Sequence, residues 1–327
     1  MKKFLAVLLV LVAVVGCKQP SPSSSSGNAV PVIGFADAFV DNTIGQAKTG
    51  FIDALQKNGF DEKNGTVKIV YRNAQGSDIT LTQIIKYFIS EKVDVLATCP
   101  STPTITALQN TKTIPVCMMV APTPELMKIN NNGAAPANLF GVGETLDYID
   151  TSFLLIPKIV KAKAGKLNIG MLFNQSEPQS VDALNRIKHL AETNNINLVP
   201  LPVNSSADVQ LVTASLLSKN IDAFFANPDN VVFASFETIV KNCDKANVPI
   251  FTSEAGLVSR GAVAAYGADI YQWGYQAGEQ AAAYLKAKSS GNAKLQWQMV
   301  QVRKRVYNAA AAKKYSLVIP ASFQAIN

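Results

Sequence analysis

The sequence predicts an α/β fold of two doubly wound parallel-sheet lobes that are joined by hinge crossovers. Short apolar runs alternate with segments of helical spacing along most of the 327 residues. At about 150 residues a domain, this length favours two lobes. Three motifs of the first half return in the same order in the second: V-I-G-F near residue 32 as N-I-G-M-L-F near 168, V-D-V-L-A-T-C-P near 93 as I-D-A-F-F-A-N-P near 221, and T-I-P-V near 113 as N-V-P-I near 247.

In the first half, apolar runs predict strands, and apolar residues that recur every three or four positions predict helices. The first helix ends at Asn58-Gly59, a typical C-terminal cap. We expect residues 133–142 to be irregular surface chain, and we place the first crossing between the lobes near Gly143. The predicted strands are residues 30–35, 66–71, 93–98 and 114–119, and the predicted helices are residues 44–58, 81–90 and 104–110.

The second half repeats this alternation after a helix in which Pro157 marks a pause. Its predicted strands are residues 168–173, 198–203, 223–226 and 249–252, and its predicted helices are residues 148–160, 181–194, 209–217 and 233–243. We expect a strand at 262–266 and the helix after it to return to the first lobe, and the tail to return to the second. The predicted lobes are therefore residues 30–143 with 256–297, and residues 144–255 with 298–327.

The N-terminus has the pattern of a lipoprotein signal. Lys2 and Lys3 precede an apolar run at 4–15, which at twelve residues is shorter than the about 20 that span a bilayer. Val14-Val15-Gly16-Cys17 resembles a lipobox, so residues 1–16 are predicted as a signal peptide and residues 17–29 as a flexible tether lipidated at Cys17. An ordinary signal peptide with a chance cysteine is the alternative. The prediction is an extracytoplasmic protein, in the periplasm or on the cell surface, that a lipid anchors to the bilayer.

Two buried strands end in polar residues that lead directly into a helix. They are V-D-V-L-A-T-C-P-S-T-P-T at residues 93–104 and I-D-A-F-F-A-N-P-D-N at residues 221–230. Backbone N–H groups at the start of a helix, with nearby hydroxyl and carboxylate side chains, are typical of binding sites at strand ends. We expect the two strand ends to face each other across a cleft that closes on a ligand by hinge motion.

Six motifs resemble one family across about residues 30–320. They are G-F-I-D-A-L-Q-K-N-G-F (50–60), Y-R-N-A-Q-G-S (71–77), T-K-T-I-P-V (111–116), N-P-D-N-V-V (227–232), G-A-D-I-Y-Q-W-G-Y-Q-A-G-E (267–279) and V-Y-N-A-A-A-A-K-K-Y (306–315). The chain resembles the bacterial ABC-transporter substrate-binding lipoproteins of the tryptophan/tyrosine-type group, which have the type I periplasmic-binding fold. It departs from them at A-D-A-F-V-D-N (36–42) and at C-M-M-V (117–120). The resemblance implies delivery of a small molecule, often an amino acid and potentially an aromatic one, to an ABC permease and its ATPase.

An amino-acid ligand needs a partner for its ammonium group and donors for its carboxylate. We predict that Asp229 binds the ammonium, with a plain N-cap role as the alternative. Ser101, Thr102 and Thr104 are predicted to bind the carboxylate together with the helix N-terminus, with capping alone as the alternative. Further ligand-binding candidates are Asn230 and, each with a structural role as the alternative, Phe39, Asn73, Gln75, Asn174, Gln175, Ser176 and Asp269. Trp273, Met118 and Met119 are interpreted as packing residues.

The sequence predicts no enzyme activity, cofactor or metal site. The single histidine, His189, lies in a helical pattern, is expected on the surface, and cannot alone supply a Ser-His-Asp triad or a histidine-rich metal site. The net charge of +7 comes from scattered basic residues, so nucleic-acid binding is not expected. Besides Cys17 there are three cysteines, an odd number that argues against a disulfide framework, although Cys99 and Cys117 could be close.

Other functions stay open at this point. A lipoprotein of this kind could sense a ligand and signal to a membrane receptor, or bind host or envelope components at the surface. The solute could also be a nucleoside or another small molecule.

Overall fold

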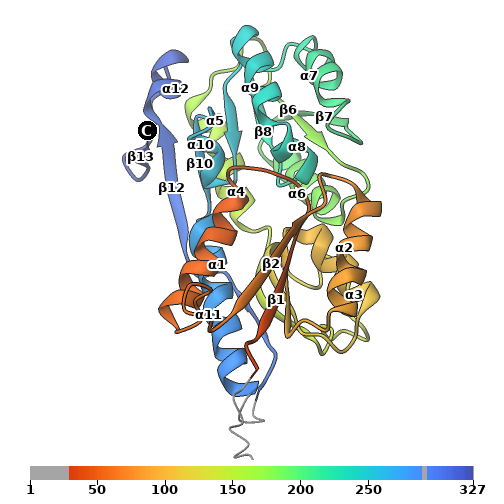
Figure 1. Cartoon of the computed structure of the whole chain (residues 1–327). Helices are drawn as coiled ribbons and strands as arrows, with labels where there is room; N and C mark the ends of the chain where they lie inside the picture. Colours follow the sequence, from red (N-terminus) through yellow and green to blue (C-terminus); the bar gives the residue numbers. More distant parts are fainter. Residues whose placement is uncertain (1–28, 289–292, 327) are drawn as a thin grey trace, which may run out of the picture.

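The computed structural model describes residues 29–288 and 293–326 as two α/β lobes, one above the other in Figure 1, with chain crossings between them. The predicted fold class of two parallel-sheet lobes is confirmed. The predicted signal peptide and Cys17 lie outside the described residues. The lobe whose sheet contains Val32–Asp37 is called the first lobe, and the other is called the second lobe.

The first lobe contains a six-stranded sheet whose strands are all parallel. Its central strands are almost fully buried because helices cover both faces, which explains their unbroken apolar sequences. In spatial order the strands are β11 (Trp297–Met299), β5 (Leu139–Glu144), β4 (Val116–Pro122), β3 (Val95–Cys99), β1 (Val32–Asp37) and β2 (Lys68–Asn73). The helices are α1 (Gly45–Lys57), α2 (Asp78–Ser90), α3 (Ser101–Asn110) and α11 (Ile270–Lys288).

The second lobe contains a seven-stranded sheet in which only the pairing of β10 with β12 is antiparallel among the described strands. In spatial order the strands are β13 (Gln324–Ile326), β12 (Arg303–Asn308), β10 (Ala264–Ala268), β9 (Ile250–Thr252), β8 (Ala223–Ala226), β6 (Asn168–Phe173) and β7 (Asn197–Pro202). The helices are α4 (Tyr148–Phe153), α5 (Ile156–Ile159), α6 (Pro178–Thr193), α7 (Val209–Leu217), α8 (Asn230–Ala234), α9 (Phe236–Lys245), α10 (Ala255–Val258) and α12 (Ala309–Lys314).

The sequence repeat corresponds to a structural repeat. The order β4-β3-β1-β2 of the first sheet matches β9-β8-β6-β7 of the second. The aspartate of each V-D or I-D motif has the same role: Asp94 Oδ2 accepts the Val32 N–H at 2.7 Å, and Asp222 Oδ2 accepts the Asn168 N–H at 2.8 Å. The paired motifs therefore fix the start of β1 in the first lobe and of β6 in the second.

Helices α1 and α11 lie side by side in the first lobe, and glycines let their backbones touch. A Cβ atom at Gly274 would lie 1.9 Å from the Ala47 carbonyl oxygen, and one at Gly50 would lie 2.1 Å from the backbone carbonyl oxygen of Tyr271. A real Cβ atom does not come this close to a backbone atom, so any other residue would force the two helices to shift. This packing explains the glycines of the 50–60 and 267–279 motifs.

Residues 133–142 were expected to be irregular, and this expectation is wrong for the last four, because β5 begins at Leu139 and is buried along its length. Its glycines serve close packing. Gly141 has a φ of +107°, and a Cβ there would lie 2.3 Å from the backbone carbonyl oxygen of Met118. At this point the pairing of β5 with β4 shifts register, between Met118 and Ala121 of β4.

The strand predicted at 262–266 does not return to the first lobe. It forms β10, which pairs with β9 in the second sheet, because α10 supplies a short crossover between the two. The crossing follows at Asp269, after which α11 and β11 join the first lobe, and the chain crosses again between β11 and β12. Ion pairs link these crossings, Arg303 with Glu144 and Lys304 with Asp269.

Candidate functional site

The two polar strand ends face each other across the boundary between the lobes, as predicted. The Asn230 amide donates to Thr102 Oγ1 at 3.2 Å and to Ser101 Oγ at 3.4 Å. Gln179 Nε2 also donates to Ser101 Oγ, at 3.1 Å. Since Ser101 and Thr102 belong to the first lobe and Gln179 and Asn230 to the second, the lobes are in a closed arrangement.

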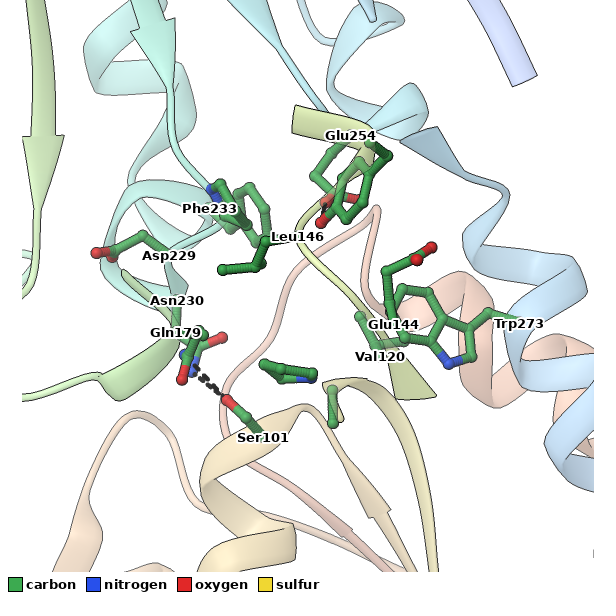
Figure 2. Close-up of a pocket in the computed structure, with 14 residues that line it drawn as sticks. Ser101, Val120, Glu144, Leu146, Gln179, Asp229, Asn230, Phe233, Glu254 and Trp273 are labelled. Carbon is green, nitrogen blue, oxygen red and sulfur yellow. Dashed lines mark hydrogen bonds between the residues drawn. The ribbon is translucent and has the colours of Figure 1, made fainter. Parts of the chain in front are cut away.

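A cavity of about 430 Å³, part of it open to solvent, lies behind these contacts, and we call it the inner cavity (Figure 2). Both lobes supply its wall, so the cavity exists in this form only when the lobes are closed. Its lining residues are Ser101, Val120, Ala121, Pro122, Glu144, Leu146, Tyr148, Gln179, Pro228, Asp229, Asn230, Phe233, Glu254 and Trp273.

Glu254 marks one end of the inner cavity. It follows β9, is 4% exposed, and accepts a hydrogen bond from the Tyr148 hydroxyl through Oε1 at 3.0 Å. Its Oε2 has no hydrogen-bond partner among the described residues. Burial, with a smaller contribution from the charge of Glu144, raises the pKa of Glu254 to about 8.

Gln179 and Ser101 mark the other end, at the start of α3, and Figure 2 shows Leu146 and Phe233 between the two ends. The Gln179 Nε2 group donates to Ser101 Oγ and, at 2.6 Å, to Glu177 Oε2. The Gln179 Oε1 atom, like Glu254 Oε2, finds no partner within residues 29–288 and 293–326. Both buried atoms are hydrogen-bond acceptors, so a molecule in the cavity would have to supply donors.

The wall between the two ends is apolar and aromatic. Phe233 and Leu146 come from the second lobe side of the cavity, and Trp273 comes from α11. The indole N–H of Trp273 donates to the Val142 carbonyl oxygen at 2.9 Å, which fixes the ring. Trp273 was interpreted as a packing residue, and it both packs and lines the cavity.

A second, outer cavity of about 1310 Å³ lies on the other side of the Asn230 contacts. Asn230 lines both cavities, and Asp78 and Glu177 add carboxylates to the outer one. Of the predicted site residues, Phe39, Gln75, Thr102 and Asn174 lie here.

Asp229 lines the inner cavity, but protein groups occupy its carboxylate. Its Oδ1 accepts the N–H groups of Val231 and Val232, the N-cap role given as the alternative. Its Oδ2 accepts the Asn174 N–H and the Ser180 hydroxyl, each at 2.6 Å. Burial raises the pKa of Asp229.

Glu177 lies beside Asp229 and was missed in the sequence. Its Oε2 accepts the Asn230 N–H at 3.1 Å in addition to the Gln179 amide. Burial, followed by the charge of Asp229, raises the pKa of Glu177 to about 8. The charge of Asp229 therefore disfavours ionisation of Glu177.

The other predicted residues line neither cavity. Thr104 is buried and shares a 2.8 Å hydrogen bond with Thr98, because α3 begins at Ser101 and turns Thr104 into the core. Asn73 accepts the Gln75 N–H and so holds a turn. Asp269 bonds to the N–H of Gln272 at the start of α11 and pairs with Lys304. Gln175 and Ser176 are exposed in the turn after β6, and His189 is exposed as expected.

Comparisons with known proteins decide the family. The family model described as ABC transporter substrate binding protein matches residues 33–325. The chain belongs to this family. A curated relative, the tyrosine-binding protein of Clostridioides difficile (strain R20291), is 31% identical over 310 residues, which cover 89% of this chain and 86% of the relative. The predicted resemblance is thereby confirmed, and this substrate-binding protein is a member of an extracytoplasmic, solute-capturing family whose partner is an ABC permease.

Solved structures share the fold. A conserved domain protein from Vibrio cholerae has a TM-score of 0.80 at 25% identity, with 91% of this chain and 100% of that chain covered. An ABC domain in complex with L-Trp from Streptococcus pneumonia has a TM-score of 0.78 at 22% identity, with 89% and 96% covered. A ligand-free, open substrate binding protein with adhesive properties from Clostridium difficile has a TM-score of 0.63 at 25% identity, with 91% and 99% covered. The lower score against an open structure agrees with the closed arrangement of this chain.

Within residues 29–288 and 293–326, no helix combines the length and the apolar character that crossing a membrane requires. The described cysteines are free and buried, so Cys99 and Cys117 do not pair.

Proposed function

We propose that this substrate-binding protein captures an amino acid with an aromatic side chain in the inner cavity and delivers it to an ABC permease. One observation carries the proposal: unused donors and an unused acceptor meet at the end of the cavity where α3 begins. The α-ammonium and α-carboxylate of an amino acid share one carbon atom, so they need both kinds of partner at one place. The Glu254 end offers carboxylates, so it suits the ammonium of this head group but not its carboxylate.

The donors for the ligand carboxylate come from α3 and its neighbour. Helix α3 begins at Ser101 without a side-chain cap, so its first N–H groups have no partner within the helix. The Ser101 hydroxyl accepts two hydrogen bonds and keeps its own hydrogen to donate. A helix N-terminus also favours a negative charge. Helix α8, by contrast, is capped by Asp229.

The ammonium has an acceptor in Gln179 Oε1. The Glu177 carboxylate accepts hydrogen bonds from Gln179 and Asn230, and Asp229 lies beside it, so both can add negative charge without touching the ligand. In this proposal Asp229 favours the ammonium at a distance, because its own hydrogen bonds are all made within the second lobe.

The aromatic wall favours an aromatic side chain. Phe233 and Trp273 present rings to the space between the two ends. The names of two similar proteins support this choice, one a tyrosine-binding protein and the other a complex with L-Trp. Binding, not catalysis, is the proposed role, and the proposed anchor is an acyl group on Cys17 after removal of residues 1–16.

Isothermal titration with tyrosine and two truncated analogues tests the head-group site. We expect tyrosine to bind, and we expect tyramine, which lacks the carboxylate, and 4-hydroxyphenylpropionate, which lacks the amine, to bind at least tenfold more weakly. Ser101→Ala should weaken tyrosine binding about tenfold, and Ser218→Ala, an exposed serine in the second lobe, should not. If no amino acid binds, or if tyramine binds as well as tyrosine, the proposal is wrong.

A further inference from the structure

The Glu254 end of the inner cavity contains a buried acceptor that the proposed head-group site does not use. Tyr148 is 6% exposed and holds Glu254 Oε1, which fixes the carboxyl group in place. Glu254 is one of the residues that line the cavity, and its buried Oε2 atom has no partner in the described chain. An orphaned buried acceptor destabilises a protein unless a ligand or water satisfies it.

We infer that Glu254 is a specificity-determining residue that accepts a hydrogen bond from the far end of the ligand side chain. This inference rests on the proposed function, because it places the amino-acid head group at the start of α3. A side chain that runs past Leu146 and Phe233 then ends at Glu254 (Figure 2). The protein would select side chains with a terminal O–H or N–H, such as a phenol or an indole, over a bare phenyl ring.

The charges around Glu254 fit a neutral donor. Glu144, the other carboxylate at this end, is neutralised by Arg303. Burial keeps much of Glu254 protonated at neutral pH, since its pKa is raised to about 8. In the uncharged carboxyl group Oε1 accepts from Tyr148 and Oε2 carries the proton, and Oε2 keeps a lone pair that accepts from a neutral O–H or N–H without an unbalanced charge in the cavity.

The expected discrimination follows from the cost of an unpaired group. Leaving one buried acceptor unpaired weakens binding by about ten- to a hundredfold. Tyrosine should therefore bind at least tenfold more tightly than phenylalanine. Tryptophan should bind more tightly, by a similar factor, than 3-benzothienylalanine, in which sulfur replaces the indole N–H.

Titration of the wild-type protein with these four amino acids tests the inference without any risk to folding. A Glu254→Leu variant should lose the discrimination, with phenylalanine bound as tightly as tyrosine. Glu192→Leu, which replaces an exposed glutamate on α6, should keep it. If Glu254→Leu does not fold, Glu254→Gln is the replacement, and it should reduce the preference for tryptophan over its sulfur analogue.

The outcomes separate the two proposals. If none of the four amino acids binds, the proposed function fails. If all four bind and phenylalanine equals tyrosine in the wild-type protein, only the inference about Glu254 is overturned. It is also overturned if Glu254→Leu still discriminates, or if lysine binds more tightly than tyrosine, which would show that this end recognises a cation.

Discussion

Arg260 holds the two lobes together, and its replacement should open the protein. Its guanidinium group donates to Asp41 Oδ2 at 2.6 Å and to Thr43 Oγ1 at 3.1 Å in the first lobe. In the second lobe it donates to Glu237 and to the Phe233 carbonyl oxygen. Opening of the lobes would break the contacts of Arg260 with Asp41 and Thr43 and would keep its contacts within the second lobe. Arg260→Gln therefore removes an interaction that belongs mainly to the closed state.

The size of the effect follows from burial. The Arg260 side chain is 12% exposed and that of Asp41 is 1% exposed, so solvent screens this pair weakly. A hydrogen bond between charged groups contributes about 1.5–3 kcal/mol, which corresponds to roughly a 10- to 150-fold change in the closing equilibrium. Because apparent affinity scales with the fraction of protein in the binding-competent state, the dissociation constant should rise by up to the same factor.

Titration calorimetry and small-angle X-ray scattering measure this effect. Arg260→Gln should bind tyrosine more weakly and should have a larger radius of gyration without ligand, with the wild-type value restored at saturation. Asp41→Asn should behave alike, since its remaining Oδ1 can still accept the N–H groups of Thr43 and Ile44. The control Arg186→Gln breaks ion pairs within the second lobe and should change neither quantity. Unchanged affinity and radius in Arg260→Gln would refute the reasoning.

Three further predictions concern packing, pH and anchoring. Gly274→Ala should destabilise the protein by about 1–3 kcal/mol in thermal denaturation, because its Cβ would meet the Ala47 carbonyl. The control Gly45→Ala should not lower stability, because its Cβ meets no described atom within 4 Å. The pKa of Glu254 is raised from 4.5 to about 8, so the folded state retains a proton that the unfolded state releases and stability falls as pH rises across that window. Glu254→Gln should therefore melt at a higher temperature than wild type at pH 8 and at the same temperature at pH 4; equal melting at both would contradict this. Cys17→Ala should move the protein from the membrane to the soluble fraction of cells, and retention in the membrane would argue against the proposed lipid anchor.

The fold was largely predictable because each strand of the repeat is a buried apolar run, and because matching motifs accompany these runs in both lobes. The failures concern elements whose place depends on a partner far away in the chain. Residues 139–142 were predicted as part of an irregular segment, and only the bulge in β4 explains why glycine is needed at 141. The strand at Ala264–Ala268 has the same local pattern in either lobe, and its pairing with β9 decides between them.

The sequence predicted which strand ends meet better than it predicted which side chains line the cavity between them. The sequence indicates which strand ends are polar, and those ends do meet. It does not reveal whether a carboxylate is already occupied, and Asp229 is occupied by Asn174 and Ser180, which lie about fifty residues earlier. Glu254 follows a buried strand, as Asp229 does, so the same rule could have identified it. Gln179 has no such signal, because its role arises only when α6 meets α3.

In the proposed function, closure and capture form a single equilibrium. The lobes already share the contacts of Arg260 with Asp41 and of Asn230 with Thr102. The acceptors at Gln179 and Glu254 take no part in those contacts. An amino acid would therefore add interactions to the closed state without displacing the ones that hold it. Since a ligand shifts an equilibrium only by its difference in affinity for the two states, a cavity walled by both lobes makes that difference large.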